Sequence, residues 1–458
     1  MKSYQIVLFS FVISTSYAQI PNTLTPADKV YGLSKFWQEV NYNFVYINRV
    51  DRVKWDSAYR QLITTVQKTE NNYQYYRELQ KFCAMLHDGH TDVNFPLSID
   101  TSIMLTMFGP YRLFIENIDG KAIIVRTNFS KKDEIPIGSE IIEVNGLPTK
   151  EYIRKEVMPY ISSSTDYILD DLSIYFLLKG LNGQSFKVKI KKPNDDIINL
   201  NLTHAKTKLI DTYPPFDKNW NLLDFKWYPN QIAYLALNTF NDPKIDTLFI
   251  NQLPELYKAQ GLIIDLRNNG GGSTDIGVNI LKYLTKDSLL YGSKQSSRLH
   301  IPAYKAWGEF RQPRDTVKNV ENKKEFLSFH DNLFYNFDYS PDTFKLKVRK
   351  IVVPTAILIG HNTASAAEDF LIYADNQKHM IKIGDRTYGS TGQPFLFDLP
   401  GGGTGRVCTK KDTYPDGREF VGYGIKPDIE VKKTLSDLIQ NKDPELDKAL
   451  EYLGTKVK

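Results

Sequence analysis

Ser365 is the first residue whose type and position could support chemistry. It lies in HNTASAAEDF (361–370), between a strand-like run and an apolar segment of helical periodicity. With Glu368 it fits the S-x-x-E capping box, in which each side chain satisfies a backbone N–H of the first helical turn. The position also suits a nucleophile, which would need a neighbouring base and hydrogen-bond donors for a developing oxyanion. Both interpretations predict a helix that begins here.

A glycine-rich turn could supply those donors. In GLIIDLRNNGGGSTDIGVNI (261–280), a buried-strand pattern leads into Asn-Asn, three glycines and a helix. Glycines leave backbone N–H groups uncovered, and a helix start favours negative charge. One glycine would be enough for a tight turn, so three favour an anion-binding role. A dinucleotide fingerprint does not fit, because Asp275 stands where its third glycine is required.

His90 is one candidate for the base, although a lone histidine is more often structural. The helical pattern before it breaks at Gly89 in LHDGHTDV (86–93), which leaves His90 on a loop. Imidazole has an unperturbed pKa close to working pH, and this suits proton transfer. His87 and His90 form H-x-x-H, but no H-E-x-x-H pattern or third ligand accompanies them, so no metal site is expected. A structural histidine is the alternative, and His361 is held in reserve as a base.

The overall composition is that of a globular protein of several domains. The chain has 458 residues, 41% of them hydrophobic and 24% charged. Its formal net charge of +5 is not gathered into one block, so nucleic acid is not an expected partner. Cys83 and Cys408 could form one disulfide or remain two buried thiols. No C-x-x-C pair indicates a cysteine-based zinc site.

The first eighteen residues have the pattern of a secretory signal peptide. Lys2 is followed by the apolar run IVLFSFVIS and by small residues that end at Ala18. Cleavage near Ala18 would give an exported protein, periplasmic or secreted. No later segment reaches about 18 uninterrupted apolar residues, so no membrane span is expected.

The remaining chain divides by pattern into four parts. Residues 19–100 are predicted to be a helical N-terminal region that carries DGHT, and 101–205 show short alternating strand signals. Within the latter, IPIGSEIIEVNGLPTKEYI (135–153) resembles the second half of a PDZ domain, a module that binds an extended peptide as an added strand. Strands alternate with helices over 206–440, which predicts an α/β core, and 441–458 is predicted to be a C-terminal helix.

The two motifs together resemble one family. DLRNNGGG followed about a hundred residues later by TASAAE is similar to the tail-specific, or C-terminal processing, serine peptidases and the related tricorn core. The resemblance implies an α/β fold with a crotonase-like catalytic domain behind a PDZ-like domain, a peptide or unfolded protein as substrate, and no cofactor. It also implies that Ser365 is the nucleophile and that the N–H groups of Ala366 and Gly271 form the oxyanion hole.

The two branches of that family differ in the residue that acts as the general base. The tail-specific branch uses a lysine 25 residues after the serine, and here that position is Ser390. The tricorn-like branch uses a histidine from the N-terminal region, and DGHT matches its form, which implies that His90 is the general base.

The group that orients His90 is left with several candidates. In the tricorn-like arrangement a serine touches the histidine, and a glutamate 50 to 60 residues after the nucleophile supports that serine. Glu419 lies 54 residues after Ser365, but Gly89 occupies the position of that serine. Either Ser390 or a direct contact between Glu419 and His90 would therefore have to substitute, and Asp88 is a rival for the orienting role.

The sequence thus predicts an exported serine endopeptidase that works through an acyl-enzyme. The alternative is a catalytically inactive protein on the same fold that binds peptides or an apolar ligand. Neither the cleavage preference nor the oligomeric state follows from the sequence.

Overall fold

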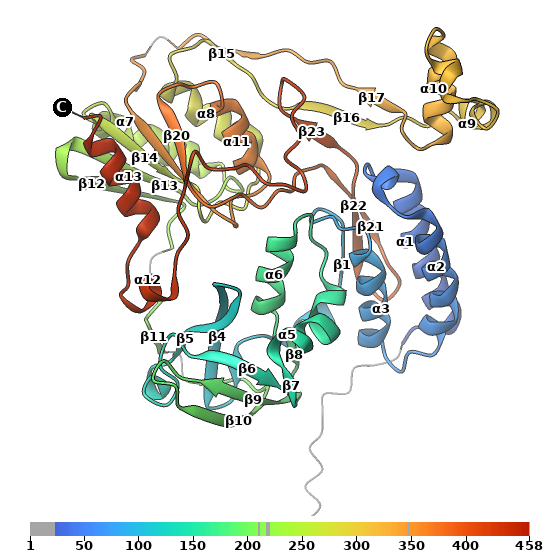
Figure 1. The fold of residues 1–458 in the computed structure, drawn as a ribbon, viewed down its shortest axis with the longest axis horizontal. Coiled ribbons are helices and arrows are strands. Elements are labelled where there is room, and N and C mark those ends of the chain that lie inside the picture. Colours follow the sequence, from blue (N-terminus) through green and yellow to red (C-terminus); the bar gives the residue numbers. More distant parts are fainter. Residues whose placement is uncertain (1–22, 209–210, 217–219, 347, 458) are drawn as a thin grey trace, which may run out of the picture.

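The architecture combines a helical N-terminal region, a mainly antiparallel middle sheet and an α/β unit (Figure 1). The computed structural model describes residues 23–208, 211–216, 220–346 and 348–457. The predicted signal peptide lies outside these residues. Among the helices that are described, none is long and apolar enough to cross a membrane.

Three capped helices form the N-terminal region. Thr25, Asp51 and Asn71 each accept a hydrogen bond from the backbone N–H three residues later, which satisfies an otherwise unpaired donor. The helices pack around Trp55, whose ring stacks on Phe82 at 3.8 Å. They share one hydrophobic cluster with the α/β unit, so the two regions form a common core. The elements are α1 (Pro26–Asn43), α2 (Arg52–Gln67), α3 (Asn72–Ala84) and β1 (Asp92–Asn94).

The middle sheet confirms the alternating strand signals. Its strand order is β10-β9-β6-β5-β4-β3, and β7 and β11 pair at its sides. Because β11 pairs with β5, the sheet extends past residue 205. Two helical segments pack on it, and α5 continues through a π-turn into a 3₁₀ turn. The elements are β3 (Met107–Phe108), β4 (Tyr111–Ile118), β5 (Lys121–Asn128), β6 (Glu140–Val144), β7 (Leu147–Pro148), α5 (Thr149–Tyr152), α6 (Asp166–Tyr175), β9 (Ser185–Lys191), β10 (Ile197–Thr203) and β11 (Thr212–Tyr213).

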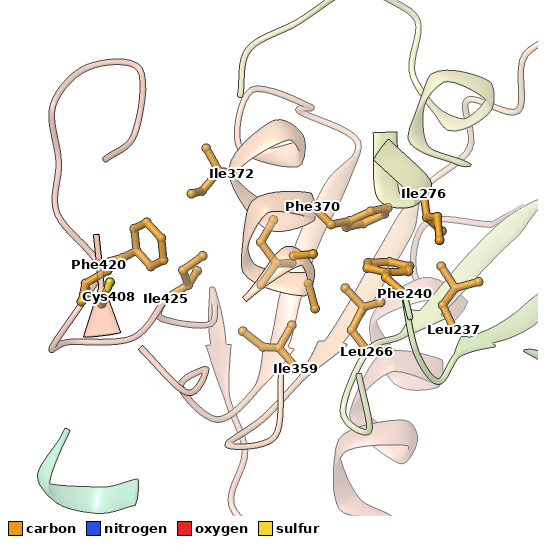
Figure 2. Close-up of a cluster of buried hydrophobic side chains, with 14 of the residues drawn as sticks. Leu237, Phe240, Leu266, Ile276, Ile359, Phe370, Ile372, Cys408, Phe420 and Ile425 are labelled. Atoms are coloured by element: carbon orange, nitrogen blue, oxygen red, sulfur yellow. The ribbon is translucent and has the colours of Figure 1, made fainter. Parts of the chain in front are cut away.

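The α/β unit has a six-stranded sheet of order β12-β13-β14-β19-β20-β24. Only β12 runs antiparallel to its neighbour, and β14 and β19 are buried along their whole lengths, as expected for parallel strands covered on both faces. Figure 2 shows Phe240 and Phe370 packed together on one side of it. The elements are β12 (Leu223–Tyr228), β13 (Ile232–Leu237), α7 (Lys244–Leu256), β14 (Gly261–Asp265), α8 (Thr274–Leu284), β19 (Thr355–Ile359), α11 (Ala366–Ala374), β20 (Met380–Gly384), β24 (Ile429–Glu430) and α13 (Pro444–Gly454).

Several further elements have no counterpart in the sequence prediction. A helical pair lies at the end of an extended arm, on the same side of the molecule as α1 in Figure 1. A small sheet of order β1-β22-β21 joins the histidine-bearing loop to the α/β unit. The elements are α4 (Leu97–Asp100), β2 (Ile103–Met104), β8 (Gly180–Leu181), β15 (Leu289–Leu290), β16 (Lys294–Arg298), α9 (Pro302–Gly308), α10 (Val320–Phe329), β17 (Phe334–Asn336), β18 (Asp342–Thr343), β21 (Pro394–Asp398), β22 (Thr404–Cys408), β23 (Lys411–Thr413) and α12 (Leu435–Ile439).

Arg267 fixes the C-terminal helix α13 against the central strands. Its guanidinium donates to Asp265 Oδ2 at 2.7 Å and to both carboxylate oxygens of Asp443, at 2.6 and 2.9 Å. Only 22% of the Arg267 side chain is exposed, so these charge-assisted bonds are partly shielded from water. The DLR motif therefore has a structural role beside the glycine turn.

Replacing Arg267 with methionine should lower the free energy of unfolding by about 3 kcal/mol, because two carboxylates would lose their shared cation. Urea unfolding followed by circular dichroism measures this. Arg60→Met, at an exposed position of α2, is the matched control and should change the midpoint little. An equal midpoint for the two variants would contradict the anchoring role.

Candidate active site

Ser365 sits in a sharp turn between a buried strand and a helix. The strand β19 ends at Ile359 and α11 begins at Ala366, and Ser365 between them has φ 55° and ψ −122°. This backbone conformation is rarely occupied by a residue with a side chain and must be held by its surroundings. Ser365 lines an open cleft of about 650 Å³ together with His90 and the glycine turn. The cleft is the site where the two sequence motifs meet.

Glu368 holds that turn and the next one. It is completely buried, and it accepts hydrogen bonds from the backbone N–H of Ser365 at 3.1 Å, which is its half of the predicted capping box. It also accepts from Thr387 Oγ1 at 2.5 Å, from Gly389 N at 2.8 Å and from Ser390 N at 3.3 Å. Burial raises the pKa of Glu368 to about 8, although each of these donors favours the carboxylate. The sequence identified Glu368 only as a helix cap.

His90 is oriented by Ser390. The distance from His90 Nδ1 to Ser390 Oγ is 2.6 Å, and Ser390 is completely buried. For His90 Nε2 to accept a proton, Nδ1 must carry the ring hydrogen, so Ser390 Oγ accepts this bond. Of the two predicted orienting contacts, the one through Ser390 is the one found in the structure.

Gly89 explains why Ser390 can reach the histidine. A Cβ atom added at Gly89 would lie 3.1 Å from Ser390 Oγ and 2.9 Å from Tyr388 Cε1. The space that a side chain at position 89 would need is therefore filled by Ser390. The backbone N–H of Gly89 donates to Ser164 Oγ at 2.9 Å, a contact from the middle region that sequence reasoning missed because the two residues are 75 positions apart.

Asp88, the rival orienter, supports the loop that carries His90. Its carboxylate accepts from Thr91 Oγ1 at 2.6 Å and from Ser164 Oγ at 3.3 Å, and it is buried. Burial raises the pKa of Asp88 to about 6, against the effect of these hydrogen bonds. Its bonds are those of a turn carboxylate that fixes the loop backbone.

The electrostatic surroundings keep His90 neutral. Burial lowers the pKa of His90 to about 4, and the nearby cations Arg406 and Lys410 lower it further in the same direction. At neutral pH the ring is therefore unprotonated, and Nε2 is available as an acceptor.

The glycine turn contacts Ser365 directly, but its donors differ from the prediction. Gly271 has φ 98°, and a Cβ atom there would lie 2.7 Å from Ser365 Cβ and 2.9 Å from Ala366 N, so only glycine fits. Its own N–H donates to Asn269 Oδ1 at 2.9 Å, which corrects its predicted role as an oxyanion donor. Ala366, at the first position of α11, lies where it was expected.

Two neighbouring amides are better placed than that of Gly271. Gly270 and Gly272 line the cleft, and among the described residues their N–H groups have no hydrogen-bond partner. Buried Asn269 shapes this turn: its Nδ2 donates to Leu237 O at 2.9 Å, and its carbonyl accepts from Ala364 N at 3.0 Å. The NNGGG pattern carries this information, but it does not reveal which amide remains free.

Glu419 lies elsewhere, and its predicted role is corrected. Its carboxylate pairs with Arg49 at 3.1 Å and with Lys411, and the side chain is 36% exposed. Lys411 is the main cause that lowers its pKa. Two surface cations therefore hold Glu419 away from His90, and Glu368 is the carboxylate that supports the Ser390 turn.

His361 does not qualify as the reserve base. Its Nδ1 is 2.5 Å from Asp171 Oδ2, and its Nε2 is 3.4 Å from Asp385 Oδ2. Burial lowers the pKa of His361, but the two carboxylates outweigh it and raise the pKa to about 9. The ring is therefore protonated and already paired on both sides.

The described residues contain neither a disulfide nor a cluster of metal-binding side chains. Cys83 and Cys408 are both free and buried, so of the two possibilities the structure has unpaired thiols. Within the described ranges, no group of three or more histidine, cysteine or acidic side chains is placed to hold a metal ion.

Replacing Glu368 with glutamine should lower the free energy of unfolding by about 2–3 kcal/mol. The NH₂ group of the glutamine would face donors that now bond to the oxygens of Glu368. Urea unfolding checks this, with Glu430→Gln, at an exposed strand position, as the control. An unchanged midpoint would show that Glu368 does not hold the two turns.

The His90 ring should titrate near pH 4 rather than near its unperturbed pKa of about 6.5. Two-dimensional NMR of protein labelled with ¹³C at the histidine rings measures this, and His90→Gln identifies the signal. A midpoint at pH 6 or above would contradict the electrostatic description of the site.

The comparisons with known proteins point to one family. Residues 231–431 match the profile of Peptidase family S41. The chain is 24% identical over 255 residues to the carboxyl-terminal-processing protease of Picosynechococcus sp., covering 55% of this chain and 50% of that protein. It is 24% identical over 353 residues to the carboxy-terminal processing protease CtpA of Bacillus subtilis, covering 75% and 60%. The chain thus spans about half to three fifths of the length of these relatives.

The fold is also shared with solved structures. Mature CPAF superimposes with a TM-score of 0.63 at 16% identity, covering 94% of this chain and 96% of CPAF. A putative peptidase from Parabacteroides merdae gives 0.51 at 17% identity, covering 94% and 97%. At these identities the likeness concerns the fold alone. The sequence matches add that residues 231–431 are similar to peptidase family S41 and that longer stretches of the chain resemble carboxyl-terminal-processing proteases.

Proposed function

We propose that this protein is an exported serine endopeptidase in which Ser365 attacks the peptide carbonyl and His90 is the general base. The observation that carries the proposal is the contact of His90 Nδ1 with Ser390 Oγ, while His90 and Ser365 line one cleft. With the ring hydrogen on Nδ1, Ser390 Oγ accepts this bond and Nε2 is free to take the serine proton.

The reaction follows the usual order for a serine nucleophile. As Ser365 Oγ bonds to the carbonyl carbon, His90 accepts its proton and then returns it to the leaving amine. Water attacks the resulting acyl-enzyme with His90 again as the base. The oxyanion is held by the N–H of Ala366 and by that of Gly270 or Gly272, at the start of α11, where the helix dipole also favours negative charge.

The domain assignments belong to the same proposal. The middle sheet, with α6 beside β4, is a PDZ-like module, and the sheet that carries Ser365 is a crotonase-like catalytic domain. Residues 1–18 direct export, and the histidine places the protein with the tricorn-like branch. The substrate is a peptide or unfolded protein, and the reaction uses no cofactor.

A second candidate function is peptide binding without hydrolysis. The observation that favours it is the absence of a lysine at position 390, where the tail-specific branch has its base. A fluorophosphonate probe separates the two functions, because it reacts only with an activated serine.

Treatment with a fluorophosphonate at pH 7.5 should label Ser365, as mapped by peptide mass spectrometry. Ser365→Ala should abolish the adduct, and His90→Gln should slow its formation by at least about 100-fold, because the general base is lost. Ser436→Ala and His330→Gln, both at exposed positions, are the matched controls. An unlabelled wild-type protein would favour the binding function, and normal labelling of His90→Gln would place the base elsewhere.

A further inference from the structure

A basic cavity lies beside the catalytic cleft. It has a volume of about 440 Å³ and extends between α3 and the helical segments that follow α5. Figure 1 shows these elements next to each other, below the sheet that contains β1. Gly89, Tyr388 and Arg406 line both this cavity and the cleft of Ser365, so the two spaces adjoin along these three residues.

Two cations in this cavity form no salt bridge with a described residue. Among the described residues, neither Arg77 nor Lys179 forms an ion pair, although both are largely withdrawn from water. The Arg77 guanidinium lies 3.4 Å from the centre of the Tyr160 ring, and Lys179 Nζ lies 4.6 Å from that of Phe176. Contacts with aromatic faces and a hydrogen bond from Arg77 to Gln80 hold the two side chains in place. Glu78 acts on the charge of Arg77 and Asp100 on that of Lys179, but neither acid is within salt-bridge distance.

Arg406 stands where the cavity meets the cleft. Its Nη2 is 2.6 Å from Asp92 Oδ2, which compensates its charge, whereas its buried Nε has no hydrogen-bond partner. Asp92 is therefore already engaged, and the other acid that lines the cavity, Glu156, is exposed. The interior of the cavity is left with a net positive charge and a spare donor.

Arg77 and Lys179 also repel each other. Burial is the main cause that lowers the pKa of Lys179, and the charge of Arg77 lowers it further. Two like charges withdrawn from water carry an electrostatic cost that an anion bound between them would remove. The volume is within the range of pockets that hold small ligands or parts of larger ones.

We propose that Arg77 and Lys179 form a subsite for a carboxylate of the substrate, reached by the part of the peptide that passes Gly89 and Tyr388. This inference rests on the proposed function, because it treats the cleft as the place where a peptide lies. The carboxylate is either an acidic side chain or the free end of the chain, since both present the same anion to the same cations.

The test measures binding in Ser365→Ala protein, so that it does not depend on hydrolysis. Four matched libraries of random synthetic peptides are used. Two have a glutamate at a fixed central position and two have glutamine there; within each pair, one library ends in a carboxylate and the other in an amide. The peptides retained by the immobilised full chain are quantified by mass spectrometry.

The same measurement is repeated with Lys179→Gln and with the Arg77→Gln/Lys179→Gln pair, each in the Ser365→Ala background. Lys155→Gln, at an exposed position of the turn after α5, is the control, and Lys179→Arg tests whether charge alone is enough. Urea unfolding verifies that each variant is folded. Lys179→Gln keeps the Arg77–Tyr160 contact, so it remains informative if the double variant is unstable.

Carboxylate-bearing peptides should be retained roughly tenfold better than their neutral counterparts, in the glutamate arm or in the chain-end arm according to the source of the anion. Lys179→Gln should remove most of this preference, while Lys179→Arg and Lys155→Gln keep it. Equal retention of all four libraries, or a preference that survives in Lys179→Gln and in the double variant, would overturn the proposal. A preference in a protein whose wild type is not labelled at Ser365 would refute the peptidase function and leave the subsite standing.

Discussion

The buried carboxylate of Glu368 is the interaction on which the rest of the site depends. It lies in the first turn of α11 and binds the backbone of the turn before it and of the turn after β20. Ser365 belongs to the first turn and Ser390 to the second, so one side chain fixes both the nucleophile and the group that orients His90. Four donors satisfy the oxygens of Glu368 in the interior, although burial without a cationic partner still raises its pKa to about 8.

The histidine reaches this arrangement from a distant part of the chain. Its loop is fixed by Asp88, by the pairing of β1 with β22 and by Ser164 from the middle region. The segment that follows Ser164 also contacts the Ser390 turn, since Tyr167 OH donates to Thr387 O at 2.6 Å and Thr165 Oγ1 donates to Tyr388 O at 3.4 Å. The middle region is thus bonded to both halves of the site, and its position affects the distance between them.

Much of the fold could be predicted from local patterns. The strand signals predicted within 101–205 include β4 (Tyr111–Ile118) and β5 (Lys121–Asn128), and the helix predicted after the three glycines is α8 (Thr274–Leu284). The joining of Ser365, His90 and the glycine turn could be expected only through the family resemblance. Spacing in the sequence says nothing about contacts between residues that are 300 positions apart.

The expected roles of Glu419 and Gly271 are wrong because position in the sequence does not determine which groups a side chain or amide contacts. Glu419 has the expected distance in sequence from the nucleophile, but the surface cations Arg49 and Lys411 bind it. Gly271 is a glycine in the expected turn, yet its amide donates to the side chain of the neighbouring Asn269. Which donor remains free is decided by backbone geometry, and no residue pattern records that.

The volume next to Gly89 is occupied by the side chains of Ser390 and Tyr388, and this affects which substitutions are tolerated at these positions. An added Cβ at position 89 would lie 3.1 Å from Ser390 Oγ and 2.9 Å from Tyr388 Cε1, so both neighbours would have to shift to make room for a side chain there. A change at position 89 or at position 390 is therefore tolerated or harmful according to the residue at the other, which is epistasis caused by a shared volume.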